Sequence, residues 1–193
     1  MKKEDILKLF EKEPFVFQRF PWKYATNKKF IKEAFVIASR ALDYASPDLK
    51  KDKEFVLELI NETPWVIEYA DDTLKNDKEV ALAAVKSNGQ TLIYVGKNLK
   101  SNKEVVMAAV KGSGFALKYA SDSMRKDKEI IMEAVKNLPE ALRYIHQSLK
   151  NDPDILNIKK LRSLKWHGTD CTQSFGFSFL GFLGIILSQD FFQ

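Results

Sequence analysis

The chain repeats itself every 25 residues without insertions. The triplet Asp52-Lys53-Glu54 returns in register at residues 77–79, 102–104 and 127–129, with Asn in place of the first Asp at residue 102. A fixed period of this length is typical of repeat proteins, in which each unit buries its apolar face against its neighbours. The period therefore constrains the fold more strongly than any single motif does.

Three further ladders share this period and register. One consists of tyrosines, one of leucines with a single methionine, and one of prolines or small residues: Tyr44, Tyr69, Tyr94, Tyr119, Tyr144; Leu49, Leu74, Leu99, Met124, Leu149; and Pro14, Ser39, Pro64, Gly89, Gly114, Pro139. Together the ladders define six copies, at 2–26, 27–51, 52–76, 77–101, 102–126 and 127–151, with a degenerate seventh that starts at 152. We expect a repeat array over residues 2–156 and a separate C-terminal segment over 157–193.

Each copy has the pattern of two short helices. In the fourth copy Asp77 is a candidate N-cap, and the run 80–86 combines strong helix formers with apolar residues at helical spacing. Asn88-Gly89 then marks a stop, and a second helix is expected over about 90–95, with Leu99 reaching back from the following turn.

Helices of one or two turns are marginal alone, because nucleation costs more than so few hydrogen bonds return. They must be stabilised by stacking on neighbouring copies. Apolar ladders supply the contacts, such as Phe35, Ile60, Val85, Val110 and Val135 on the first helix, and Leu42, Ile67, Leu92, Leu117 and Leu142 on the second. The sequence therefore predicts an all-α fold, an α-solenoid of six two-helix repeats.

The later copies approach one consensus, D-K-E-[VIF]-[VAI]-x-x-A-V-K-x-x-G-x-A-L-x-Y-A-S-x-x-L-[KR], which residues 103–125 and 128–150 match most closely. This pattern resembles the repeats grouped as domain of unknown function 4116. The resemblance covers about residues 27–151, and 2–26 more loosely, since Arg19 stands where the tyrosine recurs. It implies small helical repeats in tandem and carries no catalytic residues to transfer.

Residue chemistry argues against an enzyme. The chain has one cysteine, Cys171, and two histidines, His146 and His167, and it contains no phosphate-binding loop, dinucleotide fingerprint, zinc-protease motif or CxxC pair. We therefore expect no catalytic residues, no cofactor and no metal site.

A non-catalytic repeat protein acts through its surface. One phase of the second helix varies from copy to copy, with Arg40, Trp65, Gln90, Phe115 and Glu140 at equal steps along the chain. On a rigid frame, such variable residues would form a surface that suits one partner. The leading hypothesis is a scaffold that binds another macromolecule, with a protein as the expected partner.

Basic residues suggest a second hypothesis, binding of nucleic acid or another polyanion along one edge. Two basic rows recur with the period: Lys53, Lys78, Lys103, Lys128 and Lys75, Lys100, Arg125, Lys150. Such rows can follow a phosphate backbone. Acidic residues flank the first row, which favours an ordinary solvated surface instead. The tyrosine ladder has a similar pair of interpretations, a platform for bases or packing between copies.

The composition changes near Trp166. Residues 166–193 contain six of the 14 phenylalanines and no lysine or arginine. The apolar run 175–187 is shorter than the ~20 residues of a membrane-spanning helix. It either covers the end of the array, is poorly ordered or aberrantly encoded, or inserts shallowly in a membrane. The N-terminal residues lack the apolar stretch of a secretory signal, so an intracellular protein is the default expectation and a membrane partner is disfavoured.

Overall fold

Five α-helices of ten residues each begin at intervals of 25 residues in the computed structural model. They are α2 (Lys28–Ile37), α4 (Lys53–Glu62), α6 (Lys78–Ser87), α7 (Lys103–Gly112) and α8 (Lys128–Asn137). The structure describes Lys8 and residues 22–37 and 39–157. The chain divides into two units, Met1–His146 and Gln147–Gln193, and these five helices belong to the first. The expected copy at 2–26 and the segment from 158 onward lie almost wholly outside the described residues.

Each first helix begins directly after a side chain that caps it. The Asp77 carboxylate accepts hydrogen bonds from the backbone N–H groups of Glu79 and Val80, at 2.9 and 3.1 Å. Asn102 and Asp127 cap α7 and α8 in the same way, and Asn27 and Asp52 each accept one such bond. These bonds satisfy amide groups that the first helical turn leaves without a partner. The predicted cap at Asp77 is therefore confirmed.

The second helix of each repeat is a 3₁₀-helix of five or six residues. These helices are η3 (Ser39–Tyr44), η4 (Pro64–Tyr69), η5 (Gly89–Ile93), η7 (Gly114–Tyr119) and η9 (Pro139–Arg143). Four of them follow a residue in extended conformation, such as Asn88 with φ −148° and ψ 110°, which turns the chain out of the first helix. The break expected near Asn88 is confirmed, and the second helix begins at Gly89 itself.

A third short segment completes each repeat and carries the leucine ladder. It is helical in α3 (Pro47–Lys51) and α5 (Asp72–Lys75), and forms a single 3₁₀ turn in η6 (Leu99–Ser101) and η8 (Met124–Lys126). Leu49, Leu74 and Leu99 are buried there. Two further 3₁₀ turns occupy the equivalent sequence positions of the first and sixth copies: η2 (Trp22–Tyr24) precedes α2, and η10 (Gln147–Leu149), which carries Leu149, belongs to the second unit. The sequence placed the leucines in a turn, so this helical segment is an addition to the two-helix pattern.

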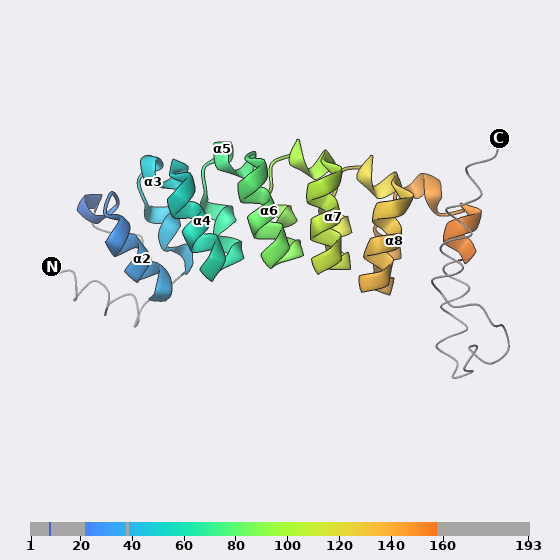
Figure 1. Cartoon of the computed structure of the whole chain (residues 1–193), viewed down its shortest axis with the longest axis horizontal. Coiled ribbons are helices and arrows are strands. Elements are labelled where there is room, and N and C mark those ends of the chain that lie inside the picture. Colours follow the sequence, from blue (N-terminus) through green and yellow to red (C-terminus); the bar gives the residue numbers. More distant parts are fainter. Residues whose placement is uncertain (1–7, 9–21, 38, 158–193) are drawn as a thin grey trace. The chain divides into compact units, whose positions relative to one another are not determined.

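Within the first unit the repeats follow one another in single file (Figure 1). First helices contact first helices, α4 with α6, α6 with α7 and α7 with α8, and second helices contact second helices in the same order. The described part of the array is thus two layers of short helices, and every regular element that the structure describes is helical. The predicted all-α solenoid is confirmed.

The core lies between the two layers and runs through successive repeats. In the described repeats the predicted ladders are buried, from Phe35 to Val135 on the first helices and from Leu42 to Leu117 on the second, whereas Leu142 is partly exposed. The alanines beside the first ladder, Ala34, Ala84, Ala109 and Ala134, have no exposed surface, so their small side chains allow neighbouring helices to approach closely.

Backbone hydrogen bonds also join each repeat to the next. In each repeat, one backbone N–H group just after the second helix donates to a carbonyl oxygen of the preceding repeat, over 2.8–3.1 Å. The five bonds run from Ser46 to Ala25, Asp71 to Lys50, Gly96 to Lys75, Ser121 to Lys100 and His146 to Arg125. Five bonds in one register fix the spacing of adjacent repeats independently of side-chain identity.

Candidate functional site

The first basic row lies at the N-terminal ends of the first helices. Its members Lys53, Lys78, Lys103 and Lys128 are each the first residue of a helix. The Nζ atom of Lys53 lies 2.8 Å from a carboxylate oxygen of Asp77 and 2.8 Å from one of Glu79. Both acids belong to the next repeat, so this lysine links two repeats rather than facing solvent alone.

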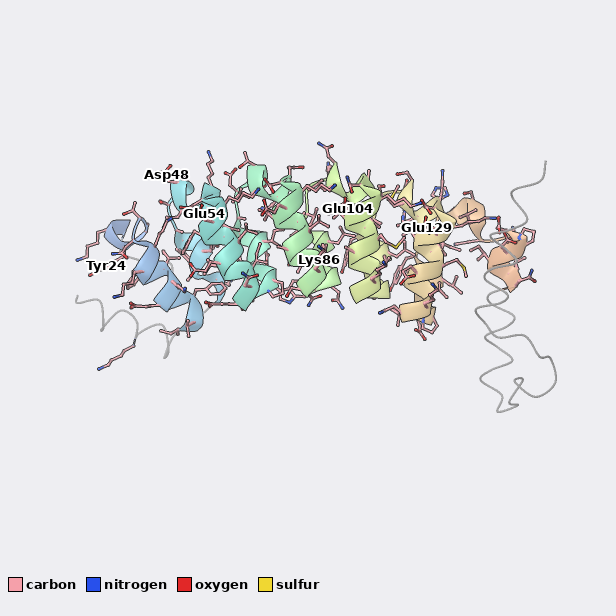
Figure 2. All side chains as sticks on the ribbon, viewed as in Figure 1. Tyr24, Asp48, Glu54, Lys86, Glu104 and Glu129 are labelled. Carbon is pink, nitrogen blue, oxygen red and sulfur yellow. The ribbon has the colours of Figure 1, made fainter. Side chains whose placement is uncertain are left out.

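The same link recurs along the array. Lys103 lies 2.9 Å from Asp127 and 2.7 Å from Glu129. Lys78 pairs with Glu104 alone, at 2.5 Å, because the capping residue of that repeat is Asn102. Figure 2 labels three of the acidic partners or their equivalents, Glu54, Glu104 and Glu129, at the same end of α4, α7 and α8. The predicted basic row is therefore one half of a row of ion pairs between repeats.

These contacts shift the ionisation of both partners. Hydrogen bonds with Asp77 and Glu79 raise the pKa of Lys53 above its ordinary value. The hydrogen bond from Lys53 lowers the pKa of Asp77, and bonds from the capped helix add to this effect while burial opposes it. Lys28 has the same effect on the pKa of Asp52. Lys53 and Asp77 thus both stay charged over a wider range of pH.

The second basic row lies in the third segment of each repeat and also has internal partners. Lys75 lies 3.2 Å from Asp72, and an Nη atom of Arg125 lies 2.5 Å from Asp122. Lys100 Nζ donates to the Ile93 carbonyl oxygen over 2.6 Å.

Burial lowers the pKa of Lys100, and the charge of Lys97 adds to this shift. Lys150, the last member of the row, is exposed and belongs to the second unit. Of the eight predicted polyanion-binding residues, at least six thus contact a carboxylate or a carbonyl oxygen of the protein itself.

The predicted partner residues lie on the second helices. Each is the second residue of its 3₁₀-helix: Arg40 in η3, Trp65 in η4, Gln90 in η5, Phe115 in η7 and Glu140 in η9. Arg40 and Glu140 are exposed, Trp65 is 36% exposed, and Gln90 and Phe115 are half-buried. The structure thus brings all five to one face, which we call the second-helix face.

Aromatic contacts on this face cross from one repeat to the next. Trp65 meets Tyr94 edge-on, with ring centroids 6.1 Å apart, and Phe115 meets Tyr144 edge-on at 5.2 Å. The Arg40 guanidinium lies 5.9 Å from the centre of the Tyr69 ring, in the same relation between repeats. All five ladder tyrosines are half-buried, as expected for packing between copies.

Two of these tyrosines share an acidic neighbour. Burial raises the pKa of the Tyr69 hydroxyl, and the charge of Glu68 adds to the shift. Burial raises the pKa of Tyr94 as well, again with Glu68 as the next cause. The Glu68 carboxylate therefore lies close to both hydroxyls and extends the polar part of this face.

A second row of residues, not predicted from the sequence, lies on the second-helix face. In a 3₁₀-helix, side chains three residues apart lie above one another. The residues three positions after the predicted row therefore share its face: Asp43, Glu68, Ile93, Lys118 and Arg143. Ile93 is 39% exposed, and Lys118 and Arg143 are exposed. A period of three in the second helices would have revealed this row.

Other candidates add no chemistry. His146 is half-buried, and Cys171 and the apolar run 175–187 lie outside the described residues. In the part of the chain that the structure describes, His, Cys, Asp and Glu form no group that could hold a metal ion. None of the helices in that part has the length and apolarity needed to cross a bilayer.

The comparison with protein families agrees with the repeat register. The family model described as "Domain of unknown function (DUF4116)" matches residues 27–75, 52–100, 77–125, 102–150 and 127–158. Successive matches begin 25 residues apart, and each of the first four spans two adjacent repeats. No curated protein and no solved structure matches the chain significantly. Because these matches cover most of the chain, the protein belongs to the DUF4116 family of tandem helical repeats.

Proposed function

We propose that this chain is a non-catalytic scaffold that binds another protein along its second-helix face, inside the cell. One observation carries the proposal: the contacts that hold the repeats together are uniform, whereas the side chains at one position of the second helices vary. The frame repeats in its caps, backbone bonds and ion pairs, whereas Arg40, Trp65, Gln90, Phe115 and Glu140 differ at equivalent positions. Repeat arrays bind partners through extended surfaces, and variable residues at equivalent positions on a regular frame would make such a surface suit one partner.

The chemistry of the row favours a protein partner. Tryptophan, tyrosine, phenylalanine and arginine are enriched in protein interfaces, and partly buried aromatic residues supply much of the binding energy. Trp65 and Phe115 are each held by a tyrosine of the next repeat, so little side-chain entropy remains to be lost on binding.

Affinity capture from native lysate tests this proposal. The wild-type chain and the double variant W65A/F115A are compared with V36A, which truncates an exposed apolar side chain on α2. Proteins retained by wild type and V36A but lost with W65A/F115A support the proposal. Identical sets of captured proteins from all three would contradict it, provided that circular dichroism shows the same helicity.

Polyanion binding along the two basic rows is the second candidate. The regular placement of lysine at the helix starts favours it, and the internal partners of six of the eight residues count against it. Retention on heparin at low salt, lost steeply as salt rises, would support this function. Absence of retention would remove it without affecting the protein-binding proposal.

A further inference from the structure

The second-helix face has a charge pattern that reverses about its centre. Along the array, the row found from the 3₁₀ geometry reads acidic, acidic, apolar, basic, basic: Asp43, Glu68, Ile93, Lys118, Arg143. Its middle member is in η5, the central second helix of the five that the structure describes. If a second copy of this row is laid against it in the opposite direction, each acidic residue faces a basic residue.

The predicted partner row has the same property. Reversed about Gln90, Arg40 comes opposite Glu140, and Trp65 comes opposite Phe115. Opposite charges and two aromatic rings thus meet in pairs, and Gln90 meets its own copy. Both rows lie side by side on one face, and each would match the same row of a second chain that runs in the opposite direction. The occupant that fits this face is therefore a second copy of the chain.

We propose that two copies associate through this face in antiparallel orientation, with the twofold axis at η5. A twofold interface uses the same patch on both chains, so each contact occurs twice. Asp43 and Glu68 of one copy then face Arg143 and Lys118 of the other, and Ile93 faces Ile93 on the axis. This inference rests on the proposed function, since it names the partner of the same face.

Most side chains of this row remain available for such contacts, whereas Glu68 is half-buried beside the Tyr69 and Tyr94 hydroxyls. Ile93 is exposed, although it lies in the middle of the row. The Asp43 carboxylate has Arg40 at 3.8 Å and Lys50 at 3.6 Å, yet 41% of its side chain is exposed. Lys118 lies over the rings of Phe115 and Tyr119, with its charged end exposed. Exposed pairs of this kind are weak, so a second copy can replace or extend them.

Neighbouring second helices hold the rows in register. They contact one another in order, η3 with η4, η4 with η5, η5 with η7 and η7 with η9. Backbone hydrogen bonds of 2.8–3.1 Å fix each repeat against the one before it. The spacing between charges is therefore the same on both copies, which antiparallel pairing requires.

Charge reversal tests the proposal on the full chain. The mass in solution is measured by analytical ultracentrifugation for wild type, for D43K/E68K and for K118E/R143E. We expect a wild-type dimer, and a dissociation constant raised at least about 100-fold in either variant, because every charged contact becomes repulsive. The control K86E/K111E makes the same change of charge as K118E/R143E at exposed residues of α6 and α7, and it should remain dimeric.

Mixing the two variants gives the decisive measurement. In the mixed pair all four charged contacts are again between opposite charges, so an equimolar mixture should form a heterodimer of wild-type affinity. The quadruple variant D43K/E68K/K118E/R143E should dimerise with itself and not with wild type. A monomeric wild type, dimers that persist in both double variants, or a mixture that stays monomeric would each overturn the proposal.

A cross-linking variant keeps the test valid if the charge variants fold poorly. In I93C/C171S the only thiol lies at the proposed axis, and mild oxidation should give a disulfide-linked dimer, whereas K118C/C171S should not link to itself. If both variants form the disulfide-linked dimer equally, or if I93C/C171S forms none, the antiparallel arrangement is overturned. A monomeric chain that still captures a protein through Trp65 and Phe115 would disprove the dimer alone and leave the proposed function standing.

Discussion

Gly89 approaches the next repeat so closely that a β-carbon at this position would lie 2.1 Å from the carbonyl oxygen of Ala109. Gly114 has the same relation to Ala134, at 2.3 Å. The obstacle in both cases is backbone of a first helix, which cannot rotate away as a flexible side chain can. The small residues of this ladder therefore permit contact between repeats as well as a turn within one.

Replacing Gly89 by alanine should destabilise the protein by about 1–3 kcal/mol, because overpacking forces the backbone of α7 to move. Gly112, the last residue of α7, provides a matched control. A β-carbon there would meet nothing closer than 3.5 Å, so G112A should be neutral or stabilising by up to about 1 kcal/mol. Urea denaturation of both variants checks this, and equal effects would show that the close approach is unimportant.

Asp77 has two roles that substitution can separate. One carboxylate oxygen caps α6 and the other pairs with Lys53. D77A removes both interactions and should cost about 1–2 kcal/mol. D77N keeps the cap, as the natural Asn102 does for α7, and should cost less than about 1 kcal/mol. Chemical denaturation gives both values, and a D77N cost equal to that of D77A would contradict this division.

Acid should weaken the contacts between repeats. The pKa values of Asp52 and Asp77 are lowered by lysines of the preceding repeat, and for Asp127 burial opposes the lowering that Lys103 and the helix N–H groups cause. A carboxyl whose folded pKa is lowered contributes stability above its ordinary pKa of about 4, and this stability is lost as pH falls further.

Thermal unfolding between pH 7 and pH 2.5 measures this loss. The triple variant D52N/D77N/D127N keeps capping side chains but has no carboxyl to titrate at these positions. Its unfolding temperature should fall less steeply below pH 4 than that of wild type. Parallel curves for the two proteins would show that these pairs do not couple to folding.

At Asn102 the row of ion pairs lacks a carboxylate at the capping position. Lys78 pairs with Glu104 alone, whereas Lys53 and Lys103 each have two carboxylates. N102D should supply the second carboxylate while keeping the cap, and stabilise the protein by about 0.2–1 kcal/mol at low salt. The gain should vanish in 1 M salt and in a K78M background. A gain unaffected by K78M would have to come from the cap instead.

The sequence by itself determined the elements that depend on local signals. Asp77 and its equivalents, followed by apolar residues at helical spacing, specify where each first helix starts, and the period places equivalent ladders in one core. The small or proline residues at Gly89 and its equivalents mark the break before each second helix. These features could be predicted because each arises within a few residues or recurs at a fixed step.

Only the tertiary structure decided how one repeat meets the next. The ion pair of Lys53 with Asp77, the hydrogen bond from Gly96 to Lys75, and the approach of Gly89 to Ala109 all cross between repeats. A period shows that positions are equivalent, but it does not show which of them are in contact, and backbone bonds leave no trace in side-chain identity. The 3₁₀ form of the second helices follows the same rule, because packing between layers stabilises a conformation that five or six residues do not specify alone.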